Sequence, residues 1–209
     1  MIGLVAITPG LGMAAQQPLE AMAAAGLRAV ILREPGLTER AYVGLARALA
    51  PIYGSGLILH SKQPAALEIA QAAGWGYHAA AGVDLGAARA AVRGLLGASC
   101  HDLGELQAAA DARCDYAVLS PVYAPTSKPG DARPPLGLEG FAALARAVPV
   151  PILALGGVTP ERCPALIAAG AAGIAALGGL FGADGSPEAA AARVILYRAA
   201  LRASELRVD

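Results

Sequence analysis

A strand-and-helix unit recurs along the chain and constrains its fold more than any other feature of the sequence. Each unit has a short apolar run, a polar or Gly/Pro break, an alanine-rich helical stretch and often Ala-Gly before the next apolar run. Glycine is the expected residue after a helix. Eight apolar runs are expected to form strands: 3–8, 29–33, 57–60, 76–79, 96–100, 116–120, 152–155 and 173–177. The helices expected after them include 38–50, 64–73, 102–111, 138–147 and 187–203.

This order of elements predicts a barrel. Strands that alternate with helices pair in parallel through right-handed crossovers, and eight such units normally close on themselves. A length of 209 residues suits one compact domain of this kind. We therefore predict an α/β protein with a single (β/α)8 TIM barrel that spans residues 1–209.

Composition excludes several classes of partner. The chain has 16 basic and 16 acidic residues, so no cationic surplus favours nucleic acid or an anionic membrane. Charged residues, glycine and proline interrupt every apolar stretch, and the N-terminus lacks the basic start of a signal peptide. The three cysteines are widely spaced, which predicts reduced thiols, a cytoplasmic location and no zinc site. The high apolar content makes a homodimer plausible.

Two glycine pairs at the ends of neighbouring strands predict a binding site for phosphate. Gly156-Gly157 follows the seventh expected strand and Gly178-Gly179 follows the eighth. Glycine lets the backbone approach an anion closely, so that several N–H groups can donate to its oxygens. Thr159 and Pro160 are expected to begin a helix directly after the first pair. A simpler interpretation is that each pair only forms a tight turn.

Polar residues at the other strand ends complete the predicted site, because the active site of a TIM barrel lies at the carboxyl ends of its strands. Arg33 and Lys128 could hold an anion, and His60 could transfer a proton near neutral pH. Lys128 and Ser127 lie in a proline-rich loop, 121–137, whose length is typical of a lid or binding loop. Further candidates are Thr8, His78, Ser99, His101 and Ser120, although His101 stands at a predicted helix start, where capping is the expected role.

The sequence contains no nucleophile elbow, Walker loop or dinucleotide-binding fingerprint. Asp84 is the only well-placed acidic residue near a strand end, and one carboxylate makes a poor magnesium site. The residues themselves thus predict a small phosphorylated ligand and no metal.

The motifs, taken in order, resemble the thiamine phosphate synthase/TenI superfamily over nearly the whole chain. The matching pieces lie at 5–8, 29–34, 56–60, 97–101, 115–123, 126–128, 136–137 and 152–157. The resemblance implies a (β/α)8 barrel that acts on thiazole phosphate in thiamine biosynthesis. It also implies that Arg33, Ser99 and Lys128 contact diphosphate, and that Gly157 and Ser127 belong to the site of the thiazole phosphate.

Departures from the family pattern bear on the choice between its two branches. The synthase branch typically has Gln-Leu-Arg-Glu-Lys at the second strand, where this chain has Ile31-Leu32-Arg33-Glu34-Pro35. It has Asn-Asp-Arg after the third strand, with the aspartate on magnesium, where this chain has His60-Ser61-Lys62. Asp84 could be the second metal aspartate, but it lies one residue further from His78 than in the family pattern. The loss of these residues weakens the diphosphate and magnesium sites of the synthase pattern, which favours the TenI-like branch.

Three functions follow from the resemblance. The leading expectation is a TenI-like enzyme that binds thiazole phosphate, or a related heteroaromatic phosphate, and catalyses metal-free proton transfer. The histidine that TenI-type tautomerases use after the sixth strand is replaced by Pro121, so we assign the proton transfer to His60 as a hypothesis. The alternative is a Mg²⁺-dependent thiamine phosphate synthase, which joins hydroxymethylpyrimidine diphosphate to thiazole phosphate and releases diphosphate. The third is a non-catalytic binder of a phosphorylated ligand.

Overall fold

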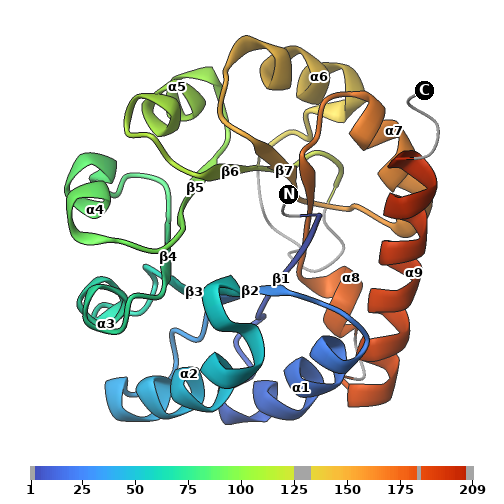
Figure 1. Cartoon of the computed structure of the whole chain (residues 1–209). Helices are drawn as coiled ribbons and strands as arrows, with labels where there is room; N and C mark the ends of the chain where they lie inside the picture. The colour runs from blue at the N-terminus through green and yellow to red at the C-terminus, as the bar shows by residue number, and fades with distance from the viewer. Residues whose placement is uncertain (1–2, 125–132, 183–184, 206–209) are drawn as a thin grey trace.

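The eight predicted strands form a closed parallel barrel. A computed structural model describes residues 3–124, 133–182 and 185–205. Every strand pairs in parallel with the next, and the eighth pairs with the first, in the order of the sequence. The predicted (β/α)8 barrel is therefore confirmed (Figure 1). The strands are β1 (Leu4–Ile7), β2 (Ala29–Leu32), β3 (Leu57–His60), β4 (Gly76–Ala79), β5 (Leu96–Cys100), β6 (Tyr116–Leu119), β7 (Ile152–Ala154) and β8 (Gly173–Ala176).

Helices form a ring outside the barrel, as Figure 1 shows. The last helix, drawn in red, lies along the first helix and along the two short helices that flank β8. The helices are α1 (Gln16–Ala24), α2 (Glu39–Tyr53), α3 (Ala66–Ala73), α4 (Leu85–Ala91), α5 (Leu103–Asp111), α6 (Gly137–Ala147), α7 (Cys163–Ala168), α8 (Gly178–Phe181) and α9 (Pro187–Glu205). Short 3-10 turns occur at Gly12–Ala15, Gly54–Gly56 and Pro160–Arg162.

Local sequence signals set the ends of several helices. The Thr38 side chain accepts a hydrogen bond from the Ala41 N–H at 3.3 Å and begins α2. The carboxylates of Asp84 and Asp102 cap α4 and α5 in the same way. After α3, Gly74 has a φ of +71°, a left-handed conformation that glycine adopts without strain. The five helices expected from sequence are all present, and no bound shifts by more than three residues.

The apolar side chains form two layers. One cluster fills the inside of the barrel, and a larger one lies between the barrel and the helices. Alternate residues of a strand point to opposite faces, so most strands contribute to both layers, whereas β4 and β5 contribute apolar side chains to the outer cluster alone. The inner cluster reaches the carboxyl end of β1 with Ile7, whereas the polar side chains of His60, His78 and Ser99 lie near the carboxyl ends of β3, β4 and β5. Its buried members are Val5, Ile7, Ala29, Ile31, Ile58, Tyr116, Val118, Leu153 and Ala175.

The chain after β7 differs from the prediction. Thr159 does not cap a helix with its side chain, and a 3-10 turn at Pro160–Arg162 precedes α7. The Thr159 hydroxyl is instead hydrogen-bonded to the side chain of Glu161, which lowers the pKa of that carboxyl. The pair Gly178-Gly179 is not a turn but forms the start of α8. The expected start is present, since Thr159 holds the N-cap position and Pro160 begins the turn, but that first turn is 3-10 and lacks a side-chain cap.

The three cysteines are buried and form no disulfide. Burial is the main cause that raises the pKa of Cys100 and Cys163 to about 12 and that of Cys114 to about 11. All three are therefore protonated near neutral pH and are poor nucleophiles. In the part of the chain that the structure describes, no helix is long and apolar enough to span a lipid bilayer.

Candidate functional site

A cavity of about 630 Å³ opens at the carboxyl ends of the strands, where the sequence predicted the site. All eight strands contribute a lining residue at their end or just past it. These residues are Ile7, Arg33, His60, His78, Ser99, Ser120, Leu155 and Ala176. The volume lies in the range of pockets that hold small organic ligands.

The two glycine pairs line this same cavity, because β7 and β8 are neighbours in the barrel. Gly156 and Gly157 have φ values of +99° and +58°. A Cβ atom at Gly156 would lie 2.9 Å from the Cα atom of Pro121, and one at Gly157 would lie 2.7 Å from the carbonyl oxygen of Ala124. Backbone conformation and close packing thus both require glycine at 156 and 157. We call the four residues 156, 157, 178 and 179 the glycine corner.

Arginines surround the glycine corner, and sequence reasoning did not find most of them. Arg162 lies over the ring of Tyr123 at 4.2 Å and donates a hydrogen bond to the carbonyl oxygen of Gly157. Arg193 of α9 donates to the carbonyl oxygen of Phe181 at 3.1 Å. The described residues that line the cavity include four arginines (33, 133, 162 and 193) and one carboxylate, Glu161. This imbalance favours an anionic ligand.

Arg33 lines the cavity, and Thr8 holds the backbone beneath it. The Arg33 N–H donates to the Thr8 hydroxyl oxygen at 2.7 Å. Thr8 is fully buried and is not among the residues that line the cavity. Its position therefore suits support of the end of β2, and a direct contact with phosphate stays a prediction. Ser127 and Lys128, the other predicted anion contacts, lie outside the described residues.

His60 lies at the cavity wall and is largely buried, with 6% of its surface exposed. Its Nδ1 atom accepts a hydrogen bond from the Lys62 N–H at 3.0 Å. In the neutral ring the proton is therefore on Nε2. This arrangement presents His60 as a hydrogen-bond donor, and its role as a proton carrier stays a prediction.

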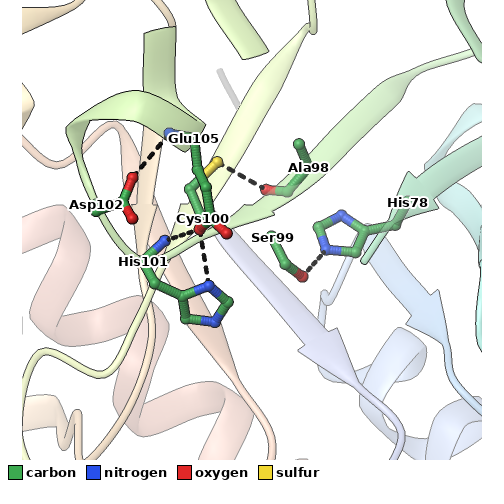
Figure 2. Close-up of polar contacts among 7 residues, drawn as sticks. All are labelled: His78, Ala98, Ser99, Cys100, His101, Asp102 and Glu105. Atoms are coloured by element: carbon green, nitrogen blue, oxygen red, sulfur yellow. Dashed lines mark hydrogen bonds and ion pairs between the residues drawn. The ribbon is translucent and has the colours of Figure 1, made fainter. Parts of the chain in front are cut away.

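A buried polar line crosses three adjacent strands at the bottom of the cavity. His78 of β4 contacts the Tyr116 hydroxyl of β6 through Nδ1 at 3.1 Å and the Ser99 hydroxyl of β5 through Nε2 at 2.9 Å. Figure 2 shows the contact between His78 and Ser99. Burial is the main reason that the pKa of His78 lies well below 6.5, and the neighbouring His60 lowers it further. His78 is therefore a neutral imidazole near neutral pH. Sequence reasoning noted His78 and missed Tyr116, which looks like an ordinary apolar barrel residue.

His101 also reaches the cavity wall, but its polar atoms serve the start of α5 (Figure 2). Its N–H and its Nδ1 atom contact Glu105 Oε2 at 2.6 and 2.8 Å. The Asp102 carboxylate accepts the Glu105 N–H at 2.9 Å. The expectation that this stretch caps a helix matches the geometry.

The residues present do not fit an aspartate-held magnesium ion. Ser61, which stands where the synthase pattern has a metal aspartate, accepts the Ala80 N–H at 2.8 Å. Asp84 is exposed and accepts the Ala87 N–H at 3.0 Å as the cap of α4. Among the described residues, no group of three or more His, Cys, Asp and Glu side chains could hold a metal ion. Ser61 therefore supplies no carboxylate, and the Asp84 carboxylate, named for the synthase alternative alone, serves as a helix cap.

The fold and the cavity define a TIM barrel with a glycine- and arginine-lined ligand site at its carboxyl face. The family model described as thiamine monophosphate synthase matches residues 4–180, and this chain belongs to that TMP-TENI family of thiamine biosynthesis. The resemblance seen in the sequence is thereby confirmed.

Several relatives named thiamine-phosphate synthase share about a third of their residues with this chain. The putative thiamine-phosphate synthase of Geobacter sulfurreducens is 35% identical over 81% of this chain and 80% of its own length. The thiamine-phosphate synthase of Roseiflexus castenholzii is 33% identical over 79% and 73%. The thiamine biosynthesis bifunctional protein ThiM/ThiE of Symbiobacterium thermophilum is 35% identical over 85% of this chain, which spans 37% of that longer protein.

Solved structures show the same fold at lower identity. The thiamine phosphate pyrophosphorylase of Pyrococcus furiosus superposes with a TM-score of 0.77 at 20% identity and covers 97% of this chain and 96% of its own. The Bacteroides thetaiotaomicron thiamine phosphate pyrophosphorylase gives 0.71 at 17% identity, with 99% and 100% covered.

Proposed function

We propose that this protein is a transferase of the thiamine phosphate synthase type. The observation that carries the proposal is one cavity with two regions suited to anions. The glycine corner forms one, and Arg33 with Ser99 at the ends of β2 and β5 forms the other. Two phosphorylated substrates need two such regions, whereas a tautomerase needs one. The names of the relatives support the same choice.

In this proposal the thiazole phosphate binds at the glycine corner through backbone N–H groups, and the pyrimidine diphosphate lies toward Arg33 and Ser99. The thiazole ring nitrogen attacks the methylene carbon of the pyrimidine, so that a C–N bond forms while the C–O bond to diphosphate breaks. The bonding electrons leave on the diphosphate oxygen. Arginine guanidinium groups stabilise the charge that develops there, and their preorganisation makes this effect large. Ser61 and Asp84 do not fit as magnesium ligands, so the arginines supply this stabilisation.

Tautomerase activity is the second candidate, and the absence of a suitable carboxylate pair among the described residues favours it. The TenI-type histidine position holds Pro121, which lines the cavity and carries no proton. The reaction would therefore depend on His60, whose Nδ1 atom already accepts the Lys62 N–H. This geometry makes the tautomerase the weaker proposal.

The decisive experiment supplies hydroxymethylpyrimidine diphosphate and thiazole phosphate together and singly, with and without Mg²⁺. We expect thiamine phosphate and diphosphate to form in equal amounts only when both substrates are present. Proton exchange on the thiazole alone, without diphosphate release, would identify the tautomerase. A raised melting temperature with thiazole phosphate and no turnover of either kind would identify a non-catalytic binder and overturn the proposal.

A further inference from the structure

The two hydrogen bonds that join Tyr116, His78 and Ser99 have a donor-to-acceptor direction. This direction determines whether the Ser99 hydroxyl can donate a hydrogen bond to a ligand. The three side chains come from β6, β4 and β5, and they meet inside the barrel wall. A glycine makes this possible. A Cβ atom at Gly97 would lie 2.1 Å from the ring of Tyr116, so the missing side chain leaves the space that the phenol occupies.

The Tyr116 hydroxyl determines which ring nitrogen of His78 carries the proton. Tyr116 is fully buried, and burial raises the pKa of its phenol, which stays protonated. Across the described residues, the His78 Nδ1 atom is the one hydrogen-bond partner recorded for this hydroxyl. A buried O–H without an acceptor is costly. The Tyr116 O–H has an acceptor when the Nδ1 atom of His78 carries no proton, so Tyr116 donates to that nitrogen.

The remaining protons follow from this first bond. A neutral imidazole that accepts at Nδ1 carries its proton on Nε2. The His78 Nε2–H then donates to the Ser99 oxygen at 2.9 Å. The Ser99 hydroxyl proton is thus left to point into the cavity that Ser99 lines. In the opposite arrangement, Ser99 would donate to His78, and the Tyr116 proton would lack an acceptor.

We propose that Tyr116 is a positioning residue that fixes the Nε2–H tautomer of His78 and so makes the Ser99 hydroxyl a hydrogen-bond donor to a phosphorylated ligand. Phosphate oxygens only accept hydrogen bonds, so a serine oriented this way favours them over ligands that present donors. The part that concerns the ligand rests on the proposed function. The tautomer itself does not.

Nuclear magnetic resonance of ¹⁵N-histidine-labelled protein tests the tautomer directly. The chain has three histidines, so substitution of His60 and of His101 one at a time assigns the His78 signals. We expect the Nε2–H form of His78 in the wild type. In Tyr116→Phe, which keeps the ring and removes the donor, we expect the Nδ1–H form or a mixture. An Nδ1–H wild type, or a tautomer unchanged by Tyr116→Phe, would overturn the proposal.

Inorganic diphosphate is the binding probe for the second half of the proposal. Tyr116→Phe and Ser99→Ala should each weaken its binding by about tenfold, as expected for one lost hydrogen bond to a charged group. The double variant should lose little more than either single one, because both act through the same hydroxyl. Additive losses would show that Tyr116 does not act through Ser99.

Tyr53→Phe is the matched control. Its hydroxyl is also buried and donates to the carbonyl oxygen of Leu19 at 2.7 Å, away from the cavity-lining residues. We expect Tyr53→Phe to lower stability and leave diphosphate affinity unchanged. A wild type that has the Nε2–H tautomer but does not bind diphosphate would overturn the proposed function and leave the tautomer assignment intact.

Discussion

The hydroxyl of Tyr197 donates a hydrogen bond to the carbonyl oxygen of Val158 across 2.6 Å. This bond ties α9, near the end of the described chain, to the loop that follows β7. The same hydroxyl lies against the other half of the glycine corner, since a Cβ atom at Gly179 would come within 2.3 Å of it. One buried tyrosine therefore bonds the residue next to Gly157 and packs against Gly179.

Replacing Tyr197 by Phe removes this bond and keeps the ring. We expect a loss of about 1 kcal/mol in the free energy of unfolding, seen as a drop of about 2–4 °C in melting temperature. Gly179→Ala in the wild type should cost more, because the hydroxyl must move. In the Tyr197→Phe background the cost of Gly179→Ala should shrink. Strictly additive losses in the two backgrounds would contradict this packing.

Alanine at Gly156 or Gly157 should disrupt the site itself. The added methyl group would meet the backbone of Pro121 or Ala124, at φ values that alanine resists. We expect destabilisation of about 1–3 kcal/mol and the loss of most of the thermal stabilisation by thiazole phosphate. Gly44→Ala in α2 is the control, as open space surrounds that position, and it should be neutral or stabilising. Unimpaired ligand stabilisation in Gly157→Ala would argue against phosphate binding there.

Thr8→Val should distinguish support of the Arg33 backbone by Thr8 from a direct contact between Thr8 and the ligand. The variant leaves the Arg33 N–H without its acceptor and should cost about 1–3 kcal/mol of stability. Diphosphate affinity should fall with it, because the end of β2 shifts. Thr8→Ser keeps the hydroxyl and should restore both quantities. If Thr8→Val weakened diphosphate binding with no change in stability, Thr8 would touch the ligand directly.

The buried His78 should make the folding stability of the protein depend on pH. Because burial lowers the pKa of this ring in the folded state, the unfolded chain takes up a proton first as the pH falls. The stability is complete above the ordinary pKa of about 6.5 and declines below it, with a limiting slope of about 1.4 kcal/mol per pH unit for one group. His78→Gln removes this contribution and should flatten the curve between about pH 6.5 and 5. Denaturant unfolding across this range measures the difference, and parallel curves would count against a buried neutral His78.

Asp84→Ala tests the metal question. The aspartate caps α4 and is exposed, so its loss should cost about 1 kcal/mol of stability. We expect the response of activity to added Mg²⁺ to be the same in the variant and the wild type. Asp102→Ala, which removes the equivalent cap of α5, is the matched control. A Mg²⁺ response that disappears in Asp84→Ala alone would place this carboxylate on the metal.

The sequence was sufficient for the barrel and for the ends of its strands, because apolar runs and glycine stops are local signals. Gly74 and Thr38 mark helix ends by their own chemistry, and the structure has them there. Thr159 also marks a helical start, but its hydroxyl bonds the Glu161 side chain and does not cap the turn, which no residue pattern indicates. The strand pattern places Tyr116 in a buried run but cannot say that a histidine two strands away receives its hydroxyl. Arg193 reaches the cavity from the last helix, and no spacing along the chain records that approach.

The missing side chain of Gly97 restricts which residues can occupy positions 97 and 116 together. The phenol of Tyr116 fits only because residue 97 has no side chain, so a larger residue at 97 requires a smaller one at 116. A descendant that gains even a methyl group at 97 must give up the tyrosine, and with it the fixed orientation of the histidine. We therefore expect related chains with a bulkier residue at 97 to have a smaller one at 116.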